Sequence, residues 1–172
     1  MNRKDCGKAL LLLSLAGAAA AGLGACAGEP PRRPNVMHPV HERRALEILS
    51  RVLREGQLQP EAGHSIMLQT KGAVLQLDVA AAGHRFGVAY VTHEEVAALG
   101  DAIPKFDPES DALILVDGLE NGAGWHALLL YDKNYLSDDL EGEGHSVTNI
   151  AAEKKIERDA KDFLVKAQHE QW

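Results

Sequence analysis

Residues 65–92 read SIMLQTKGAVLQLDVAAAGHRFGVAYVT, and this stretch decides the fold. It holds three segments rich in Val, Leu, Ile, Phe and Tyr, at 65–69, 73–79 and 84–92, separated by glycine-containing breaks. Short apolar runs between turn residues are typical of antiparallel strands. The core-facing side is predicted to carry Leu75, Leu77 and Val79 in the second segment, opposite Val74, Gln76 and Asp78, and Phe86, Val88 and Tyr90 in the third.

The residues that follow predict two more strands and a short helix. Residues 93–100 have Glu94 and Glu95 in a first helical turn and Gly100 as a stop. The apolar run 112–116 is typical of a strand buried on both faces. We expect 117–124 to be a turn or short loop and 125–131 to be a strand paired antiparallel with 112–116.

Two longer segments carry apolar residues at helical spacing. Segment 40–55 has such a stripe and ends at Gly56, and segment 149–168 has another, with Asn149 as the expected N-cap. Glu157 with Lys161, and Asp162 with Lys166, are spaced to pair on the exposed side of the second helix. The sequence therefore predicts an α+β domain, in which a mostly antiparallel sheet of about five strands packs against an N-terminal and a C-terminal helix.

The first 26 residues have a different character. Arg3, Lys4 and Lys8 precede an uncharged run of Leu, Ala and Gly that ends in Leu23-Gly24-Ala25-Cys26. A basic start, a short apolar segment and small residues before a cleavage point are typical of a secretory signal.

The last four residues of this leader resemble the lipobox of bacterial lipoproteins. That resemblance covers residues 1–26 only. It implies that 1–25 is a signal peptide removed by lipoprotein signal peptidase and that Cys26 becomes the first residue and carries acyl chains such as palmitate. Ala27 at the next position implies, by the rule of enteric bacteria, sorting to the outer membrane of a Gram-negative bacterium.

Two alternatives to lipidation remain open from the residues alone. An uncleaved membrane anchor is one, although the run from Ala9 to Cys26 is short for a span of about 20 residues. Plain secretion is the other, and it leaves Cys26 as a lone thiol, because Cys6 departs with the leader. Residues 26–39 contain several prolines and little to bury, so we interpret them as a flexible tether, with 40–172 as a single globular domain.

The charge of the mature chain restricts its partners. The leader holds three of the 18 basic and one of the 25 acidic side chains, so cleavage leaves a net charge of −9. Such a surface repels phosphate backbones and anionic lipid heads, so we expect no nucleic-acid binding, and membrane contact only through the lipidated N-terminus.

Several motifs approach known sites without matching them. The acidic segment 132–145 has oxygen ligands suited to calcium, but its spacing does not fit an EF-hand, and we interpret it as a solvated loop. His64-Ser65 and His145-Ser146 lack the pattern of a nucleophile elbow. His93-Glu94-Glu95 lacks the second histidine of a metalloprotease, and Trp125, His126 and Tyr131 are more typical of packing than of a carbohydrate platform.

The sequence thus predicts no catalytic residue, cofactor or metal, and Cys26 is the one site it assigns. We expect an envelope lipoprotein with a small non-enzymatic binding or structural domain, whose partner is an envelope protein. The alternatives are a lipid-anchored hydrolase, using some of His64, His84, His126, His145 and nearby acids, and a toxin or immunity factor in competition between cells.

Overall fold

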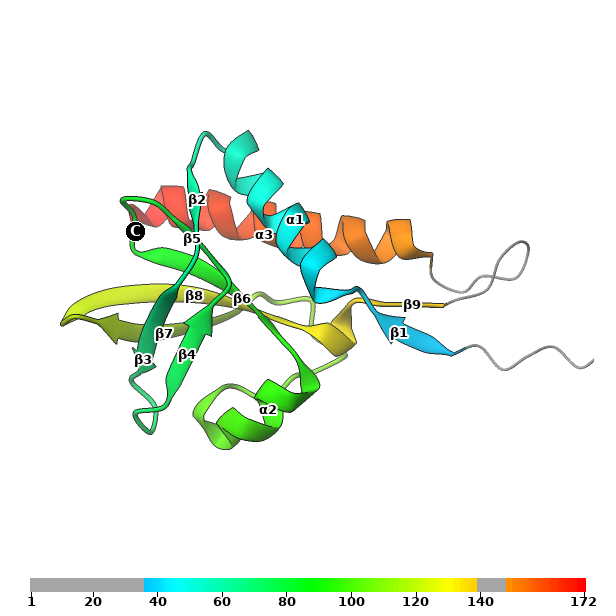
Figure 1. Ribbon diagram of the computed structural model, residues 1–172, viewed down its shortest axis with the longest axis horizontal. Coiled ribbons are helices and arrows are strands. Elements are labelled where there is room, and N and C mark those ends of the chain that lie inside the picture. Colours follow the sequence, from blue (N-terminus) through cyan, green and yellow to red (C-terminus); the bar gives the residue numbers. More distant parts are fainter. Residues whose placement is uncertain (1–35, 139–147) are drawn as a thin grey trace, which may run out of the picture. The chain divides into compact units, whose positions relative to one another are not determined.

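Seven strands form one curled, mixed sheet, in the order β2-β5-β6-β8-β7-β3-β4 (Figure 1). The computed structural model describes residues 36–138 and 148–172, within the compact unit Pro34–Trp172. The sheet contains β2 (Pro60–Glu61), β3 (His64–Leu68), β4 (Val74–Leu77), β5 (Val79–Ala81), β6 (Phe86–Val91), β7 (Ile114–Glu120) and β8 (Ala123–Tyr131). The helices are α1 (Glu42–Glu55), α2 (His93–Leu99) and α3 (Asn149–Glu170), with short 3-10 turns η1 (Gly100–Ala102) and η2 (Asp132–Asn134). The chain is therefore α+β, as the sequence predicts.

The sheet curls because the two halves of one bent strand, β4 and β5, pair with different strands. β4 pairs with β3, and β5 pairs with β6, although only Asp78 separates β4 from β5. β7 pairs with both β8 and β3, which brings the sheet round to its starting strand. The predicted single strand 73–79 is thus a bent strand in two halves.

Asp78 and Gly87 explain the bend. The Asp78 amide donates to the Val88 carbonyl at 3.0 Å, and the Tyr90 amide donates to the Asp78 carboxylate at 2.7 Å, so a side chain replaces the next backbone acceptor. A Cβ on Gly87 would lie 2.9 Å from the Val79 carbonyl oxygen. Only glycine permits so close a crossing of β5 and β6.

The sheet is mixed because β6 and β8 run parallel, with Phe86 opposite His126 and Val91 opposite Tyr131. The other strand pairs of this sheet are antiparallel.

Strand β7 differs from the expected strand 112–116. It begins at Ile114 and continues through the expected loop to Glu120, and Ile114 and Leu115 are half-buried rather than buried on both faces. Asn121 and Gly122 alone make the turn to β8.

Two hydrophobic cores lie on opposite sides of the sheet. The inner core is enclosed by the curl, and the outer core lies between the sheet and helices α1 and α3 (Figure 1). Strand alternation separates them, so that Ala89 of β6 lies in the inner core and Val88 and Tyr90 lie in the outer one. Members of the inner core include Ile66, Leu68, Leu75, Leu77, Trp125, Leu129 and Tyr131. Phe86 and Phe163, in the outer core, meet edge to face at 5.7 Å.

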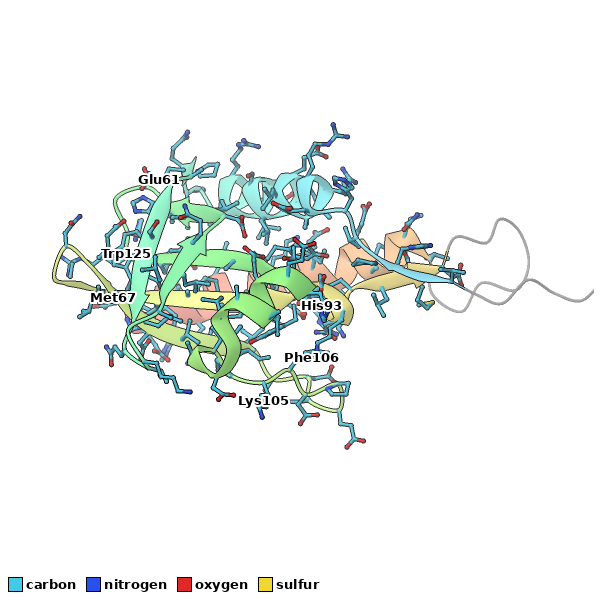
Figure 2. All side chains as sticks on the ribbon, turned by 60° about the horizontal axis from the view of Figure 1, so that its bottom comes forward. Glu61, Met67, His93, Lys105, Phe106 and Trp125 are labelled. Carbon is cyan, nitrogen blue, oxygen red and sulfur yellow. The ribbon has the colours of Figure 1, made fainter. Side chains whose placement is uncertain are left out.

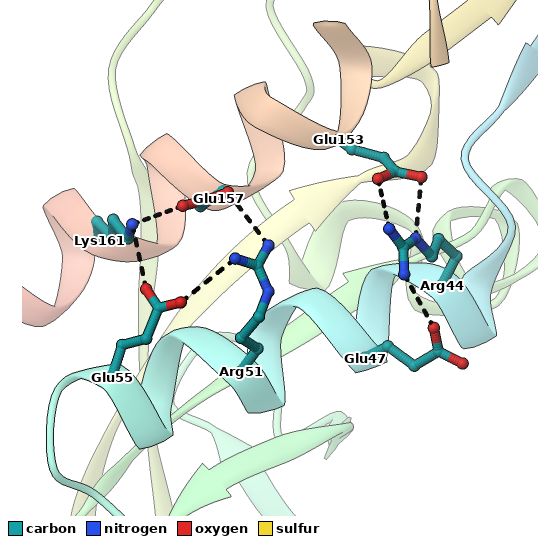
Figure 3. Close-up of polar contacts among 7 residues, drawn as sticks. All are labelled: Arg44, Glu47, Arg51, Glu55, Glu153, Glu157 and Lys161. Atoms are coloured by element: carbon teal, nitrogen blue, oxygen red, sulfur yellow. Dashed lines mark hydrogen bonds and ion pairs between the residues drawn. The ribbon is translucent and has the colours of Figure 1, made fainter. Parts of the chain in front are cut away.

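Ion pairs join α1 to α3 along their exposed sides (Figure 3). Arg44 binds Glu153 with two hydrogen bonds of 2.9 and 2.7 Å, and this contact lowers the pKa of the Glu153 carboxyl. Arg51 reaches Glu157 at 3.1 Å, and Lys161 bridges Glu157 and Glu55. The predicted Glu157–Lys161 pair is thus confirmed, whereas Lys166 pairs with Glu170 rather than with Asp162. Exposed pairs of this kind add little stability, so the apolar burial of α1 and α3 in the outer core is what holds the two helices together.

A second, two-stranded sheet lies beside α3. β1 (Met37–Pro39) pairs antiparallel with β9 (Leu136–Asp138), inside segments that we expected to be tether and loop. Val40 follows β1 and donates its amide to the Tyr135 carbonyl at 2.9 Å. Regular structure therefore begins before residue 40. The helix α3 begins at Asn149 as expected, but Thr148 is its N-cap.

Within the described ranges, 36–138 and 148–172, no helix is both long and apolar enough to cross a membrane.

Candidate functional site

Three large apolar side chains are exposed side by side on the outer face of β4, β3 and β7. Met67 is 53 % exposed, Val74 59 % and Leu119 43 %. Met67 lies opposite Val74 on one side and Leu119 on the other, so the three form one row across three strands. We call this row the apolar face.

The apolar face follows from strand alternation. Ile66 and Leu68 point into the inner core, so Met67 between them points out. Beside the row, the Ser65 hydroxyl donates to the Gln76 side-chain oxygen at 2.7 Å. Helices α1 and α3 cover the outer side of other strands. Contiguous exposed apolar groups are typical of a surface that contacts another molecule.

A cluster of charged side chains lies next to this face, at one end of the curled sheet. His64, the first residue of β3, hydrogen-bonds Glu120 through Nδ1 at 2.9 Å and Glu61 through Nε2 at 2.8 Å. The His64 ring also packs on the buried Trp125 ring, with centroids 4.6 Å apart. Figure 2 shows Glu61, Trp125 and Met67 at the same end of the molecule, away from His93 on α2.

The geometry favours a charged imidazole at this position. Each ring nitrogen faces a carboxylate, which accepts but does not donate, so only the doubly protonated ring can donate to both. The hydrogen bond from Glu120 is the largest cause of the raised pKa of His64, and partial burial opposes it. His64 thus links β2, β3 and β7, and protonation of its ring strengthens both contacts.

Three of the described histidines, His64, His84 and His126, make their hydrogen bonds to carboxylates or to a backbone carbonyl. Both ring nitrogens of His64 are occupied by glutamates, and Ser65 is bonded to Gln76 instead. His126 bonds Asp117 at 2.8 Å and stacks on Trp172 at 4.2 Å. His84 contacts the Trp172 carbonyl at 3.3 Å. None of these hydrogen bonds joins one of the three rings to a hydroxyl group.

The remaining motifs have structural roles where they are described. His93-Glu94-Glu95 starts α2, and Thr92 and Glu95 form its capping box. Asp132 accepts a hydrogen bond from the His93 amide at 3.0 Å. In residues 36–138 and 148–172, no group of three or more His, Cys, Asp or Glu side chains is placed to hold a metal ion. Cys26, and the acidic residues and His145 within 139–147, lie outside the described residues.

Sequence reasoning missed the apolar face and both glutamates that bind His64. The sequence did contain one sign of the apolar face. Val74 lies on the same side of its strand as the polar Gln76, where an apolar residue is expected to be exposed. Glu61 and Glu120 lie far apart in sequence, and only pairing of β3 with β7 brings Glu120 to His64. No family model matches this chain, and no curated protein or solved structure is detectably similar to it.

Proposed function

We propose that this chain is an exported lipoprotein, anchored in the outer membrane through Cys26, whose domain binds another envelope protein through the apolar face. The observation that carries the binding role is the row of Met67, Val74 and Leu119, left exposed where no helix of the described residues covers the sheet. The leader and its lipobox-like end support the anchor. The occupied ring nitrogens of His64 support a role without catalysis.

We also infer that the curled sheet is a five-stranded, mostly antiparallel barrel of the OB type, with β2 as an extension. The supporting pattern is the spatial order β3, β4–β5, β6, β8, β7, with a parallel β6–β8 pair and with α2 between β6 and β7 along the chain. OB barrels bind oligonucleotides on the face of their second and third strands.

That face is occupied in this chain by its own helices. Val79, Phe86 and Val88 belong to the outer core with residues of α1 and α3. Together with the net charge of −9 after cleavage, the covered face supports a domain that does not bind nucleic acid.

Site-specific photo-crosslinking in the native bacterium tests the binding role. A photoreactive residue at position 67 or 74 should give discrete crosslinked species in the envelope fraction. Val165 on α3 is the matched control, because it is equally apolar and 67 % exposed but lies outside the row. The same products from position 165, or none from 67 and 74, would contradict the proposed face.

A further inference from the structure

Strand β7 has an edge that the sheet uses for only part of its length. β8 pairs with β7 from Ile114 to Glu120. On the other side, β3 pairs with β7 only at Leu119 and Gly118, because β3 ends at Leu68 and the chain turns back toward β4. The stretch from Ile114 to Asp117 therefore has a strand on one side only.

The hairpin geometry shows which backbone groups face the open side. Asn121 and Gly122 have φ of 50° and 80°, as in a two-residue type I′ turn, so Glu120 and Ala123 are the closing hydrogen-bonded pair. Bonded and non-bonded pairs then alternate, which turns the amide and carbonyl of Leu115 and Asp117 away from β8. One contact agrees with this pattern, since the Gln69 amide donates to the Asp117 carbonyl at 3.3 Å.

A cavity of about 370 Å³ runs beside this open edge. Leu115, Val116 and Asp117 form one wall, and the segment from Asp101 to Pro104 forms the other. Leu68, Gln69 and Thr70 close one end. Ile103 in the second wall is buried, whereas the carboxylates at the rim are open to solvent. We call this cavity the β7 slot.

The charges at the rim indicate what kind of side chain fits. The side chain of Asp101 is 70 % exposed and that of Asp117 is 61 % exposed. Lys71 approaches Asp101 at 3.3 Å from the β3–β4 turn, and His126 bonds Asp117 at 2.8 Å, so each carboxylate keeps exposed oxygen surface but already has one partner from this chain. A peptide in the slot can hydrogen-bond the backbone amide and carbonyl of Leu115. A basic side chain of that peptide can approach the carboxylates at the rim.

We propose that the β7 slot binds an extended segment of another protein as an added strand, antiparallel to β7 and in line with β3, with a lysine or arginine at the Asp101 rim. Strand addition to an open edge uses main-chain hydrogen bonds for affinity and side-chain contacts for selectivity. Both groups of Leu115 would bond a single residue of the added strand. A second copy of this domain fits less well, because the edge is recessed between the Asp101–Pro104 wall and the β3–β4 turn.

Amide hydrogen exchange of the full chain in detergent micelles, followed by NMR, tests this proposal. In the free protein the Ile114 and Val116 amides, bonded to β8, should exchange slowly, and the Leu115 amide quickly. The probe is the capped peptide Lys-Val-Thr-Val-Lys at millimolar concentration. It should slow exchange at Leu115 severalfold and leave Ile114 and Val116 unchanged, whereas the same peptide with every amide N-methylated should have no effect.

The charge at the rim is tested with one variant and its matched control. Asp101→Asn should weaken binding of the lysine peptide about two- to fivefold, the range expected for an exposed ion pair. Asp162→Asn, on the exposed side of α3, should not change it. Equal affinity of the two variants for the lysine peptide would contradict the proposal that a basic side chain binds at Asp101.

Three results would overturn strand addition itself. One is an unchanged Leu115 amide at saturating peptide. Another is slow exchange at Leu115 in the free protein at every protein concentration, which would mean that this chain fills its own slot. The third is slow exchange that appears only as protein concentration rises, which would mean that two copies pair edge to edge. None of these results bears on the apolar face, so the two proposals fail separately.

Discussion

His64 is the residue whose charge state matters most to the described domain, because it holds glutamates from two other segments. Its pKa is raised in the folded state, so the stability it contributes is fully present below its ordinary value of 6.5 and is lost as pH rises through the folded pKa. His64→Gln should therefore destabilise the domain by about 1 kcal/mol near pH 6 and by less near pH 9.

Thermal unfolding at the two pH values measures this effect. The exposed His169→Gln on α3 serves as the control and should leave the midpoint unchanged at both. A loss from His64→Gln that is the same at acidic and alkaline pH would show that the ring acts by packing on Trp125 alone.

The stability that depends on Asp78 also falls as pH rises, but over a lower pH range than for His64. Burial raises the pKa of this carboxyl from 3.8 to about 6, and the hydrogen bond from the Tyr90 amide only partly offsets that burial. The folded protein holds this proton more tightly than the unfolded chain, so stability falls as pH rises from about 4 to about 6. Asp78→Asn keeps an acceptor for Tyr90 and removes the charge. It should stabilise the domain by about 1–2 kcal/mol at neutral pH relative to its effect near pH 4, measured by chemical denaturation.

Among the elements, α3 is the main cover of the outer core. Phe163 is fully buried and contacts Phe86, whereas Lys161 is half exposed and forms ion pairs. Phe163→Ala should cost about 3–5 kcal/mol of unfolding free energy, and Lys161→Ala less than about 1 kcal/mol. Denaturation of the two variants decides this, and equal small losses would mean that α3 does not stabilise the sheet.

The pairing of β1 with β9 makes a second prediction at this scale. A chain that begins at Val36 keeps both short strands, whereas one that begins at Val40 leaves β9 without its partner. The shorter chain should lose about 1–2 kcal/mol of stability through the missing backbone hydrogen bonds. Thermal midpoints of the two chains test this, and identical midpoints would place β1 outside the cooperative unit.

Elements set by local pattern were predictable, and elements set by distant pairing were not. The helical stripes predict α1 and α3 to within two residues at most ends, and the apolar runs predict β3, β6 and β8. The parallel β6–β8 pair and the β1–β9 sheet depend on partners far away in sequence, and the break at Asp78 depends on hydrogen bonds to β6 that the apolar pattern does not show. The same limit applies to the candidate site, where His64 was named but Glu120, 56 positions away, was not; Glu61 lies only three residues from His64 and was also missed.

For the whole molecule, the anchor is the most direct prediction from the sequence. Metabolic labelling with a fatty acid should mark the wild-type protein and not Cys26→Ala. Fractionation should place the labelled protein in the outer membrane, and the unlabelled variant should no longer be retained there. Label that persists in Cys26→Ala would exclude this cysteine as the acylation site.

The parallel pairing of β6 with β8 also determines how late in folding the sheet can close. If the chain is exported N-terminus first, as we propose, α1 emerges early, but its Arg44 meets Glu153 of α3 across 109 positions of sequence. The sheet curls shut only when Tyr131 has arrived opposite Val91. Long-range closure of this kind is slow. Under the proposed export, the domain is therefore expected to stay open until β8 and α3 have crossed the membrane.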